Sequence, residues 1–457
     1  MNERIFKAYD VRATYPDMLN EDAAWRIGYA TAQFLKQKAE PVKNGDTIVV
    51  GRDMRKSSPS LATALSDGIR AARMNVIDVG MIDTSMIYFA INHLEAAGGI
   101  QTTASHNPAQ YNGFKISGAK AKPIGSASGL DDIKRIALGL ESKSAVSTGR
   151  YREQDIWAAY RTHVRQFLDL KRPLRVVVDG SNGMAGKMVP AVFAGAPNLT
   201  IVPLLFECNG TFTHDPNPLV ESNLDMLKAK MATEKPDLGA CFDGDADRCV
   251  FLEESGHLIG SDLVTALLAR DFLHVPANKG STIVYDLRSS RVVPEEVKFA
   301  GGIPRRDRVG HAFIKKTMSE TKAVFGGELS GHFYFRDNFF ADSGAIAFAR
   351  LLSILSAQPK PLSGLIAPLR RYFQSGEVNF QVPDKESKIK ELAATYKSAE
   401  IDYLDGITIN CGDWWFNVRQ SNTEPLLRLN LEAASQREME AKFAELKMIL
   451  GEPVHGH

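Results

Sequence analysis

The chain has 457 residues, more than one hydrophobic core usually supports, so we expect about three domains, or four if one is small. Hydrophobic residues make up 44% and charged residues 24%, which is typical of a packed globular protein and not of a disordered or fibrous one. The 55 Lys and Arg residues nearly balance the 54 Asp and Glu residues, and the net charge of +1 gives no basic field for nucleic acid or an anionic membrane. Any anion site must therefore be local.

Cysteine usage and hydropathy favour a cytoplasmic protein. The four cysteines form neither a Cys-x-x-Cys pair nor the spacing of a secreted scaffold, so we expect reduced, structural thiols at Cys208, Cys241, Cys249 and Cys411. The first six residues lack the apolar core of a signal peptide, and no run approaches the roughly 18 apolar residues of a membrane span. We therefore expect no membrane partner and no nucleic-acid partner.

A β-rich run followed by a helical pattern occurs three times. The three runs are residues 47–53, 175–180 and 282–286. A second strand is predicted after each run, at residues 76–79, 199–202 and 297–299. After the first run, Ser58 and Pro59 predict the N-cap and first residue of a helix. This recurrence favours an α/β fold with three related domains and mixed sheets over one large sheet.

Beyond the strands of each unit lies a loop rich in reactive side chains. These loops are residues 102–108, 242–248 and 326–332. Equivalent loops of three related units are expected to converge on one central cleft.

The last part of the chain has a different pattern. Turn signals at 405–406 and 412–413 separate β-rich segments, and Ser435 with Glu438 forms a capping box before a final helix. We expect a smaller α+β domain here. The predicted domains are 1–147 with the loop 102–108, 148–256 with the loop 242–248, 257–369 with the loop 326–332, and 370–457.

The loop 243–248 places Asp243, Asp245 and Asp247 at alternate positions between two apolar runs. Three carboxylates so close to a core would repel each other without a cation, and carboxylate oxygens suit a hard divalent ion. A solvated acidic turn is the alternative. The pattern favours a metal site, with Mg²⁺ as the first choice.

Ser105 lies in the sequence Thr-Ala-Ser-His-Asn-Pro and by itself indicates only a polar turn. The adjacent His106 raises the possibility of a Ser–His hydrolase, but neighbouring residues rarely align a nucleophile with its base, and no G-x-S-x-G motif is present. If a metal binds the aspartates and Ser105 lies near it, the serine is suited to carrying a phosphoryl group.

Two further segments suit a phosphorylated sugar. Residues 419–425 with Arg428 supply guanidinium groups, hydroxyls and an amide, a good cradle for a phosphate dianion, although a polar turn fits equally well. The loop 326–332 offers glycines, a carboxylate and a hydroxyl that suit vicinal sugar hydroxyls, although a plain loop is at least as consistent. Lys115 follows the serine loop closely enough to reach the same phosphate, whereas Arg12 and His311 would not be selected on physical grounds alone.

Seven motifs, in order along the chain, resemble those of the α-D-phosphohexomutase family, whose members have three related α/β domains and a fourth of different fold around a central cleft. The motifs are KAYDVR, GRDMRKSSP, TTASHNPAQYNGFK, DGDADR, VGHAFIK, GELSGH and RQSNTEPLLR. Within the family, the segments SNTEPLLRL and RDNFFADSG are most similar to bacterial phosphomannomutases.

The resemblance implies a role for each matching residue. Ser105 would be the phosphoserine, which with Asp243, Asp245 and Asp247 holds Mg²⁺; Lys115, His106 and Arg12 would complete the catalytic set, with Lys115 and His106 in proton transfer. The substrate-binding set would be Tyr9, Arg248, Arg288, His311, Glu328, Ser330, His332, Arg419, Ser421, Asn422, Thr423 and Arg428. Within these sets, Glu328 and Ser330 would read sugar hydroxyls, and the residues from Arg419 to Arg428 would hold the non-reacting phosphate.

The implied activity is the reversible conversion of mannose 6-phosphate and mannose 1-phosphate through a hexose 1,6-bisphosphate, which also serves as activator. Three departures from the family pattern are Ala13, Gln420 and the segment 288–290. The last of these bears on hexose preference and leaves a glucose-specific or dual-specificity hexose mutase as the alternative. Two other classes remain open: a Mg²⁺-dependent sugar phosphatase and a non-catalytic sugar-phosphate binding protein. We expect small-molecule hexose phosphates as partners and a monomer or weak dimer.

Overall fold

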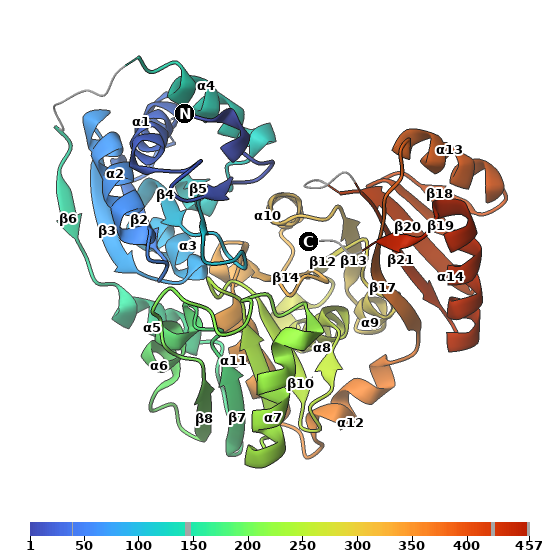
Figure 1. The fold of residues 1–457 in the computed structure, drawn as a ribbon. Coiled ribbons are helices and arrows are strands. Elements are labelled where there is room, and N and C mark those ends of the chain that lie inside the picture. The colour runs from blue at the N-terminus through green and yellow to red at the C-terminus, as the bar shows by residue number, and fades with distance from the viewer. Residues whose placement is uncertain (39, 142–147, 422–425, 455–457) are drawn as a thin grey trace. The chain divides into compact units, whose positions relative to one another are not determined.

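The computed structural model describes residues 1–38, 40–141, 148–421 and 426–454 (Figure 1). The chain folds into two compact units, each formed by two stretches of sequence. The first unit contains Met1–Ile259 and Ser330–Ser363, and the second contains Gly260–Leu329 and Gly364–His457. The helix α12 (Leu362–Ile366) is the segment in which the chain passes for the last time from the first unit to the second.

The N-terminal part of the first unit contains a six-stranded mixed sheet in the order β1-β5-β4-β2-β3-β6 (Figure 1). Its strands are β1 (Val11–Thr14), β2 (Asn44–Arg52), β3 (Asn75–Met81), β4 (Ala96–Thr102), β5 (Tyr111–Gly118) and β6 (Tyr151–Glu153). Its helices are α1 (Glu21–Gln37), α2 (Ser58–Ala71), α3 (Thr84–His93) and α4 (Leu130–Leu138). The strand β2 pairs in parallel with β3 and β4, whereas β5 runs antiparallel to β4. The two strands predicted for this part are confirmed.

The start of α2 differs by one residue from the prediction. Ser57 is the N-cap, without a side-chain capping hydrogen bond, and Ser58 is the first helical residue. The Ser58 hydroxyl instead donates to Asp53 Oδ1 at 2.5 Å, because both side chains are buried beside the end of β2. The serine is therefore used to satisfy a buried carboxylate and not to cap the helix.

A second sheet of the first unit has the order β11-β10-β9-β7-β8. Its strands are β7 (Leu174–Asp179), β8 (Leu199–Leu204), β9 (Leu238–Phe242), β10 (Cys249–Glu253) and β11 (Leu258–Ile259). The helices of this part are α5 (Trp157–Arg165), α6 (Ala185–Phe193), α7 (Asp225–Glu234) and α11 (Gly344–Ser356), and β15 (Phe333–Phe335) pairs with β16 (Ala341–Asp342). The strands β9 and β10 are antiparallel and fully buried, with Phe242 opposite Cys249, so the loop 243–248 is the turn that joins them.

The first part of the second unit has three parallel strands in the order β13-β12-β14. They are β12 (Thr282–Asp286), β13 (Ile303–Asp307) and β14 (Phe325–Gly327), with helices α8 (Ser261–His274), α9 (Val292–Phe299) and α10 (His311–Thr321). The strand predicted at 297–299 is wrong, because these residues form the last turn of α9 and the strand begins at Ile303. A three-residue Val-Lys-Phe run carries no periodicity that separates a strand from a helix end.

The C-terminal part is an antiparallel sheet with two helices, which confirms the predicted α+β character. Its strands are β17 (Phe373–Phe380), β18 (Glu400–Asp402), β19 (Ile407–Asn410), β20 (Trp414–Gln420), β21 (Leu427–Ala433) and β22 (Pro453–Val454), and its helices are α13 (Lys385–Thr395) and α14 (Gln436–Leu450). Ser435 caps α14 by accepting a hydrogen bond from Glu438 N, as predicted. Trp414 and Phe416 lie in the core of this sheet.

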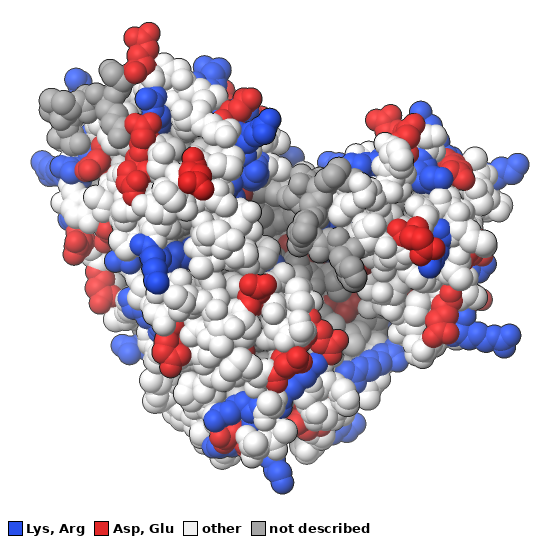
Figure 2. All heavy atoms as spheres, in the orientation of Figure 1, with Lys and Arg blue, Asp and Glu red and all other residues white. Residues whose placement is uncertain are grey.

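The mixed surface charge and the free thiols agree with the near-neutral net charge and the expected reduced cysteines. Lys and Arg side chains are interspersed with Asp and Glu side chains on the face shown in Figure 2. All four cysteines are free. In the part of the chain that the structure describes, every helix is too short or too polar to cross a membrane.

The helices α1 and α2 pack backbone to backbone through glycines. A Cβ at Gly68 would lie 2.0 Å from Trp25 O, and a Cβ at Gly28 would lie 2.1 Å from Leu65 O. We therefore expect Gly68→Ala to push the two helices apart and to lower the free energy of unfolding by about 1–3 kcal/mol. Gly139→Ala is the matched control, since Gly139 has α-helical backbone angles and its nearest new contact is 3.4 Å away. Equal thermal midpoints for the two variants would contradict this packing argument.

Candidate active site

The turn between β9 and β10 places three carboxylates in the interior of the first unit. Asp243, Asp245 and Asp247 are each at most 1% exposed, and one oxygen of each lies within 4.8 Å of the others. Ala246 has a φ of 59°, a left-handed conformation that tightens the turn and directs the aspartates to one side. The predicted cluster of carboxylates therefore forms, and the β9–β10 hairpin holds it in place.

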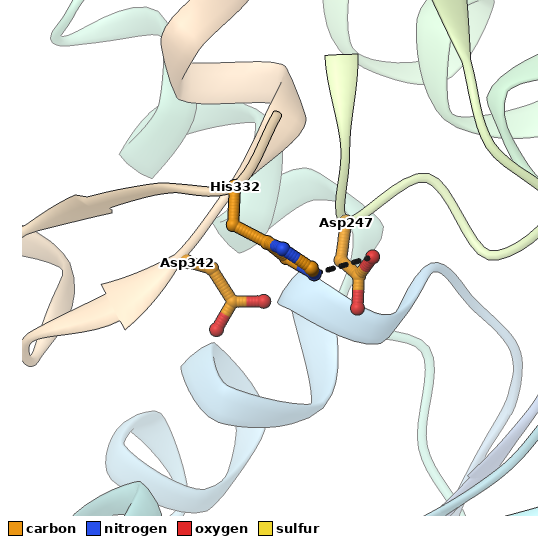
Figure 3. Close-up of side chains that lie close together, drawn as sticks. All are labelled: Asp247, His332 and Asp342. Carbon is orange, nitrogen blue, oxygen red and sulfur yellow. Dashed lines mark ion pairs between the residues drawn. The ribbon is translucent and has the colours of Figure 1, made fainter. Parts of the chain in front are cut away.

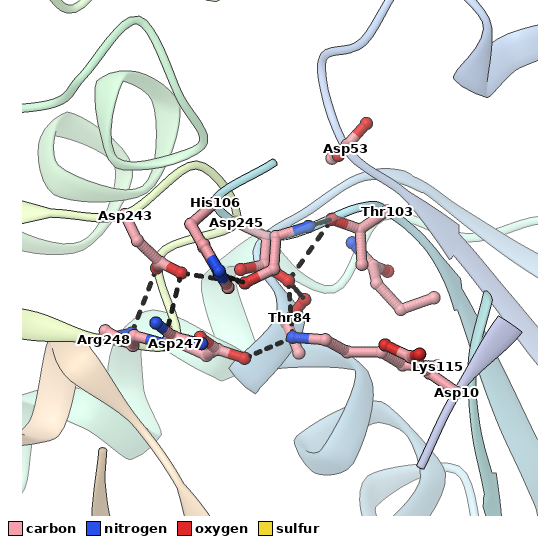
Figure 4. A network of polar contacts seen from close by, with 12 residues as sticks. Asp10, Asp53, Thr84, Thr103, His106, Lys115, Asp243, Asp245, Asp247 and Arg248 are labelled. Atoms are coloured by element: carbon pink, nitrogen blue, oxygen red, sulfur yellow. Dashed lines mark hydrogen bonds and ion pairs between the residues drawn. The ribbon is translucent and has the colours of Figure 1, made fainter. Parts of the chain in front are cut away.

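Cationic groups surround this cluster (Figure 4). Lys115 on β5 lies 2.8 Å from Asp245 Oδ2 and 2.5 Å from Asp247 Oδ2, and Arg248 Nε lies 3.7 Å from Asp243 Oδ2. Burial and the neighbouring carboxylates raise the pKa of Asp243 well above its usual range. Burial would raise the pKa of Asp247 as well, but Lys115 and a histidine lower it far below its usual range. The lysine and arginine do not fully compensate three carboxylates.

The donor set fits a hard divalent cation. Asp245 Oδ1 is buried and has no hydrogen-bond partner, which leaves an oxygen available as a ligand. The three carboxylates supply only oxygen ligands, as Mg²⁺ prefers. Ser105 Oγ donates to Asp243 Oδ2 at 3.0 Å, so the serine lies beside the same oxygens.

The loop that carries Ser105 joins β4 to β5 and contacts the aspartate turn closely. Ser105 has a φ of 50°, and its N–H donates to Thr103 Oγ1 at 2.9 Å. A Cβ at Gly244 would lie 2.4 Å from Ser105 O, so this approach requires glycine. Thr84 Oγ1 also donates to Asp245 Oδ2, at 2.6 Å, which joins the N-terminus of α3 to the turn.

Two further predicted residues lie beside Ser105. His106 Nδ1 is 3.3 Å from Ser105 Oγ, and burial together with Arg248 and Arg12 holds the pKa of His106 well below its usual range. Arg12 on β1 donates to Asn107 Oδ1 at 2.7 Å and to Asp10 at 2.5 Å. Burial would lower the pKa of Lys115, but the adjacent carboxylates raise it above its usual value. The structure thus brings the predicted catalytic residues together.

His332 links the aspartate turn to the β15–β16 hairpin (Figure 3). Its Nε2 lies 3.5 Å from Asp247 Oδ1 and 3.3 Å from Arg248 Nε, and its Nδ1 lies 2.8 Å from Ser330 Oγ. Asp342 completes a second group of potential ligand atoms with Asp247 and His332. Because both ring nitrogens already have polar neighbours, we interpret His332 as a member of a hydrogen-bond network and not as a metal ligand.

In the second unit, three arginines surround one carboxylate. Arg419 and Arg428 lie directly opposite each other on β20 and β21, where like charges repel. Glu377 on β17 accepts hydrogen bonds from Arg419 at 2.8 Å, Arg428 at 3.1 Å and Arg288 at 3.4 Å. Arg288 and Arg419 are 8% and 2% exposed, so Glu377 holds together an arginine group that is largely buried.

Arg288 also connects this group to the glycine-rich loop. It donates to Asp286 Oδ2 at 2.7 Å, and the same oxygen accepts from Leu329 N at 2.9 Å. Glu328 is 2% exposed and accepts from Gly310 N at 3.0 Å, immediately before His311 at the start of α10. The second unit therefore gathers Arg288, Arg419 and Arg428 around Glu377, and Glu328 bonds the backbone next to His311.

The remaining predicted residues are less informative. Ser421 is half-buried, and its N–H donates to Leu426 O at 2.9 Å. Asn422 and Thr423 lie outside the described residues. Tyr9 is half-buried and packs near Gly125.

Sequence reasoning missed Arg55, Thr84, Thr103 and Asp342 in the first unit and Glu377 in the second. Arg55 belongs to a motif quoted for the family resemblance, which was a usable signal. The others are ordinary polar residues in their segments, and only the folded sheets bring them to the site.

Comparisons with known proteins give a consistent family. Models of the phosphoglucomutase/phosphomannomutase family match along the chain as α/β/α domain I at residues 3–143, α/β/α domain II at 158–256, α/β/α domain III at 260–372 and the C-terminal domain at 377–447. A protein of Xanthomonas campestris named "Phosphohexose mutases" is 39% identical over 454 residues, covering 97% of this chain and 98% of the relative. The phosphomannomutase of Escherichia coli K12 is 38% identical over 461 residues, covering 98% and 99%.

A solved structure agrees with these relatives. The chain is similar to a phosphoglucomutase/phosphomannomutase family protein from Burkholderia thailandensis, with a TM-score of 0.90 and 32% identity over 98% of this chain and 97% of that one. The chain therefore belongs to the phosphoglucomutase/phosphomannomutase family. This confirms the resemblance inferred from the motifs and the α/β fold class with a distinct C-terminal domain, whereas the predicted domain boundaries and residue roles stay predictions.

The metal site can be tested by cation binding. We expect Asp245→Asn to weaken Mn²⁺ affinity at least about tenfold, because it replaces a carboxylate of the candidate site by a neutral amide. Titration followed by electron paramagnetic resonance would measure the affinity without any substrate. Asp131→Asn on the exposed face of α4 is the control. Wild-type affinity in Asp245→Asn would exclude this carboxylate as a ligand.

Glu377 should make stability depend on acid pH. Burial would raise its pKa, but Arg288, Arg419 and Arg428 lower it from 4.5 to about 2, which corresponds to roughly 3 kcal/mol as an upper estimate for a side chain that is 24% exposed. Because the folded-state pKa is lowered, this contribution is complete above pH ~4.5 and declines as the pH falls towards 2. We expect Glu377→Gln to lose this pH dependence in urea unfolding, whereas the exposed Glu386→Gln keeps it. Parallel pH profiles for wild type and Glu377→Gln would contradict the assignment.

Proposed function

We propose that the protein is a phosphohexomutase that interconverts mannose 6-phosphate and mannose 1-phosphate, with Ser105 as the carrier of the phosphoryl group. The observation that carries the proposal is the hydrogen bond of Ser105 Oγ to Asp243 within a cluster of three buried carboxylates. Relatives of matching length at 38% identity are named phosphomannomutase, which supports mannose phosphates as the substrate class.

The proposed reaction moves one phosphoryl group at a time. A sugar hydroxyl oxygen forms a bond to the phosphorus on Ser105 while the bond from phosphorus to Ser105 Oγ breaks. The proton of the sugar hydroxyl passes to a neighbouring base, and a proton from a neighbouring acid passes to Ser105 Oγ, so that Ser105 ends as a hydroxyl. We propose that His106, 3.3 Å from Ser105 Oγ, and Lys115, beside Asp245 and Asp247, take part in the proton movement. A Mg²⁺ bound by the three aspartates would supply positive charge beside the transferring group.

The second unit supplies the binding of the other phosphate. Arg288, Arg419 and Arg428 offer guanidinium groups that suit a dianion, and we propose that this arginine group accepts the phosphate at either end of the hexose. Glu328 is proposed to accept hydrogen bonds from sugar hydroxyls. A hexose 1,6-bisphosphate is the proposed activator, since it would restore phosphate to Ser105. We also propose a cytoplasmic location, which the free cysteines favour.

A dual-specificity hexose mutase is the second candidate. The Xanthomonas relative is named "Phosphohexose mutases" and the family name includes phosphoglucomutase, which favours activity on glucose phosphates as well. No comparison supports the phosphatase alternative.

Ser105→Ala provides the main test. With Mg²⁺ and hexose 1,6-bisphosphate present, we expect turnover of mannose 1-phosphate to fall roughly 10³-fold or more, because the covalent carrier is lost. Ser398→Ala at an exposed position is the control. Comparing mannose, glucose and glucosamine 1-phosphates on the wild type decides the substrate. Unchanged turnover in Ser105→Ala, or free phosphate as the dominant product, would overturn the proposed function.

A further inference from the structure

Arg55 lies behind the Ser105 loop and gathers its carbonyl groups. It is 1% exposed and comes from the turn between β2 and α2. Its Nη2 donates to Ser105 O at 2.8 Å and Asn107 O at 2.6 Å, and its Nη1 donates to Pro108 O at 2.7 Å and Tyr111 O at 3.1 Å. One guanidinium group thus fixes three peptide carbonyls of the loop and one at the start of β5.

The guanidinium itself is held from two sides. Asp53 Oδ2 accepts from its Nε at 3.1 Å, and Asp53 Oδ1 accepts from the Arg55 backbone N–H at 2.9 Å. The ring of Phe212 lies 5.1 Å from the guanidinium carbon, and the backbone at Gly210 approaches Lys56 N and Met54 O. These contacts exclude water from the arginine, which strengthens its hydrogen bonds to the loop.

The carbonyl contacts determine where the N–H groups of the loop point. Ser105 O and the N–H of His106 belong to one planar peptide and point to opposite sides. With Ser105 O fixed against Arg55 and Gly244, the His106 N–H is directed away from both. Ser105 itself has a φ of 50°, which is unfavourable for a serine and persists only when surrounding contacts determine it.

The His106 N–H is the open donor of this loop. The Ser105 N–H donates to Thr103 Oγ1 at 2.9 Å, and the Asn107 N–H donates to Ala104 O at 3.0 Å. Among the described residues, the His106 N–H has no hydrogen-bond acceptor. It lies one residue after Ser105, so an anionic group attached to Ser105 Oγ would be within its reach, as in other concave sites formed by backbone N–H groups.

We propose that Arg55 is a positioning residue that orients the His106 backbone N–H as a hydrogen-bond donor to the phosphate carried by Ser105. The proposal rests on the proposed function, because it requires that Ser105 is phosphorylated. It assigns the binding of this phosphate in part to the main chain, in addition to the side chains predicted from the motifs. Arg55 would act through the loop without touching the phosphate.

Selective labelling tests the donor directly. The chain has ten histidines, so protein labelled with ¹⁵N-histidine gives a small set of backbone amide signals, and His106→Gln identifies the one of interest. After phosphorylation with hexose 1,6-bisphosphate, we expect a downfield shift of the His106 amide proton, because a charged oxygen accepts its hydrogen bond. Intact mass measures the extent of phosphorylation in the same sample.

Arg55→Lys tests the positioning role, since lysine keeps the charge but lacks the planar fork that reaches several carbonyls. We expect the downfield shift to be lost and kcat to fall about 10–100-fold with KM within about twofold, because the loop is misplaced while sugar binding is retained. Arg165→Lys is the matched control, since Arg165 donates to Val192 O and Ala194 O at the end of α6. If Arg55→Lys does not fold, Phe212→Leu takes its place as the test. It removes only the ring beside the guanidinium, so we expect a smaller loss of kcat.

The outcomes separate the two proposals. A phosphorylated wild type whose His106 amide does not shift would overturn this inference and leave the proposed function intact. A shift and kcat at wild-type values in both Arg55→Lys and Phe212→Leu would overturn the role of Arg55. Absence of phosphate on Ser105 after treatment with the bisphosphate would overturn the proposed function and this inference with it.

Discussion

The burial of three carboxylates in one turn is the constraint on which the first unit depends. Asp243, Asp245 and Asp247 follow a fully buried strand and precede another, so the hairpin cannot expose them to water. Buried charges require partners, and Lys115 and Arg248 supply only part of the compensation. The incomplete compensation and the unpartnered oxygen of Asp245 make the turn suited to a cation. The strands are needed to hold the site, because isolated carboxylates would separate.

The second unit has the opposite charge imbalance, an excess of positive charge. Arg419 and Arg428 face each other across two strands, Arg288 joins them, and Glu377 is the carboxylate that all three share. A dianion is the natural complement of such a group, because each guanidinium can donate to phosphate oxygens in pairs. Glu377 therefore keeps the arginines assembled while leaving net positive charge.

Much of this could be predicted from the sequence because the chemistry lies in short segments. The three aspartates lie in one short segment, and Ser105 and Lys115 lie in another. The strands around residues 47–53 and 175–180 have clear β-rich runs. The second strand of the third β-rich repeat was predicted at 297–299, which is wrong. The true strand β13 contains Pro304 and charged residues, which an edge strand tolerates and which resemble a loop in sequence.

The residues that could not be predicted reach the site through sheet register. Glu377 meets Arg428 because β17 pairs with β21, and Asp342 comes close to His332 because β16 pairs with β15. A carboxylate far from its partners in sequence gives no local signal, since its role is decided by pairing between strands. Arg55 is a related case, because its partners are carbonyl groups, which every residue has. The motif identified the serine, but the conformation of the serine depends on an arginine 50 positions earlier, whose contacts only the folded chain reveals.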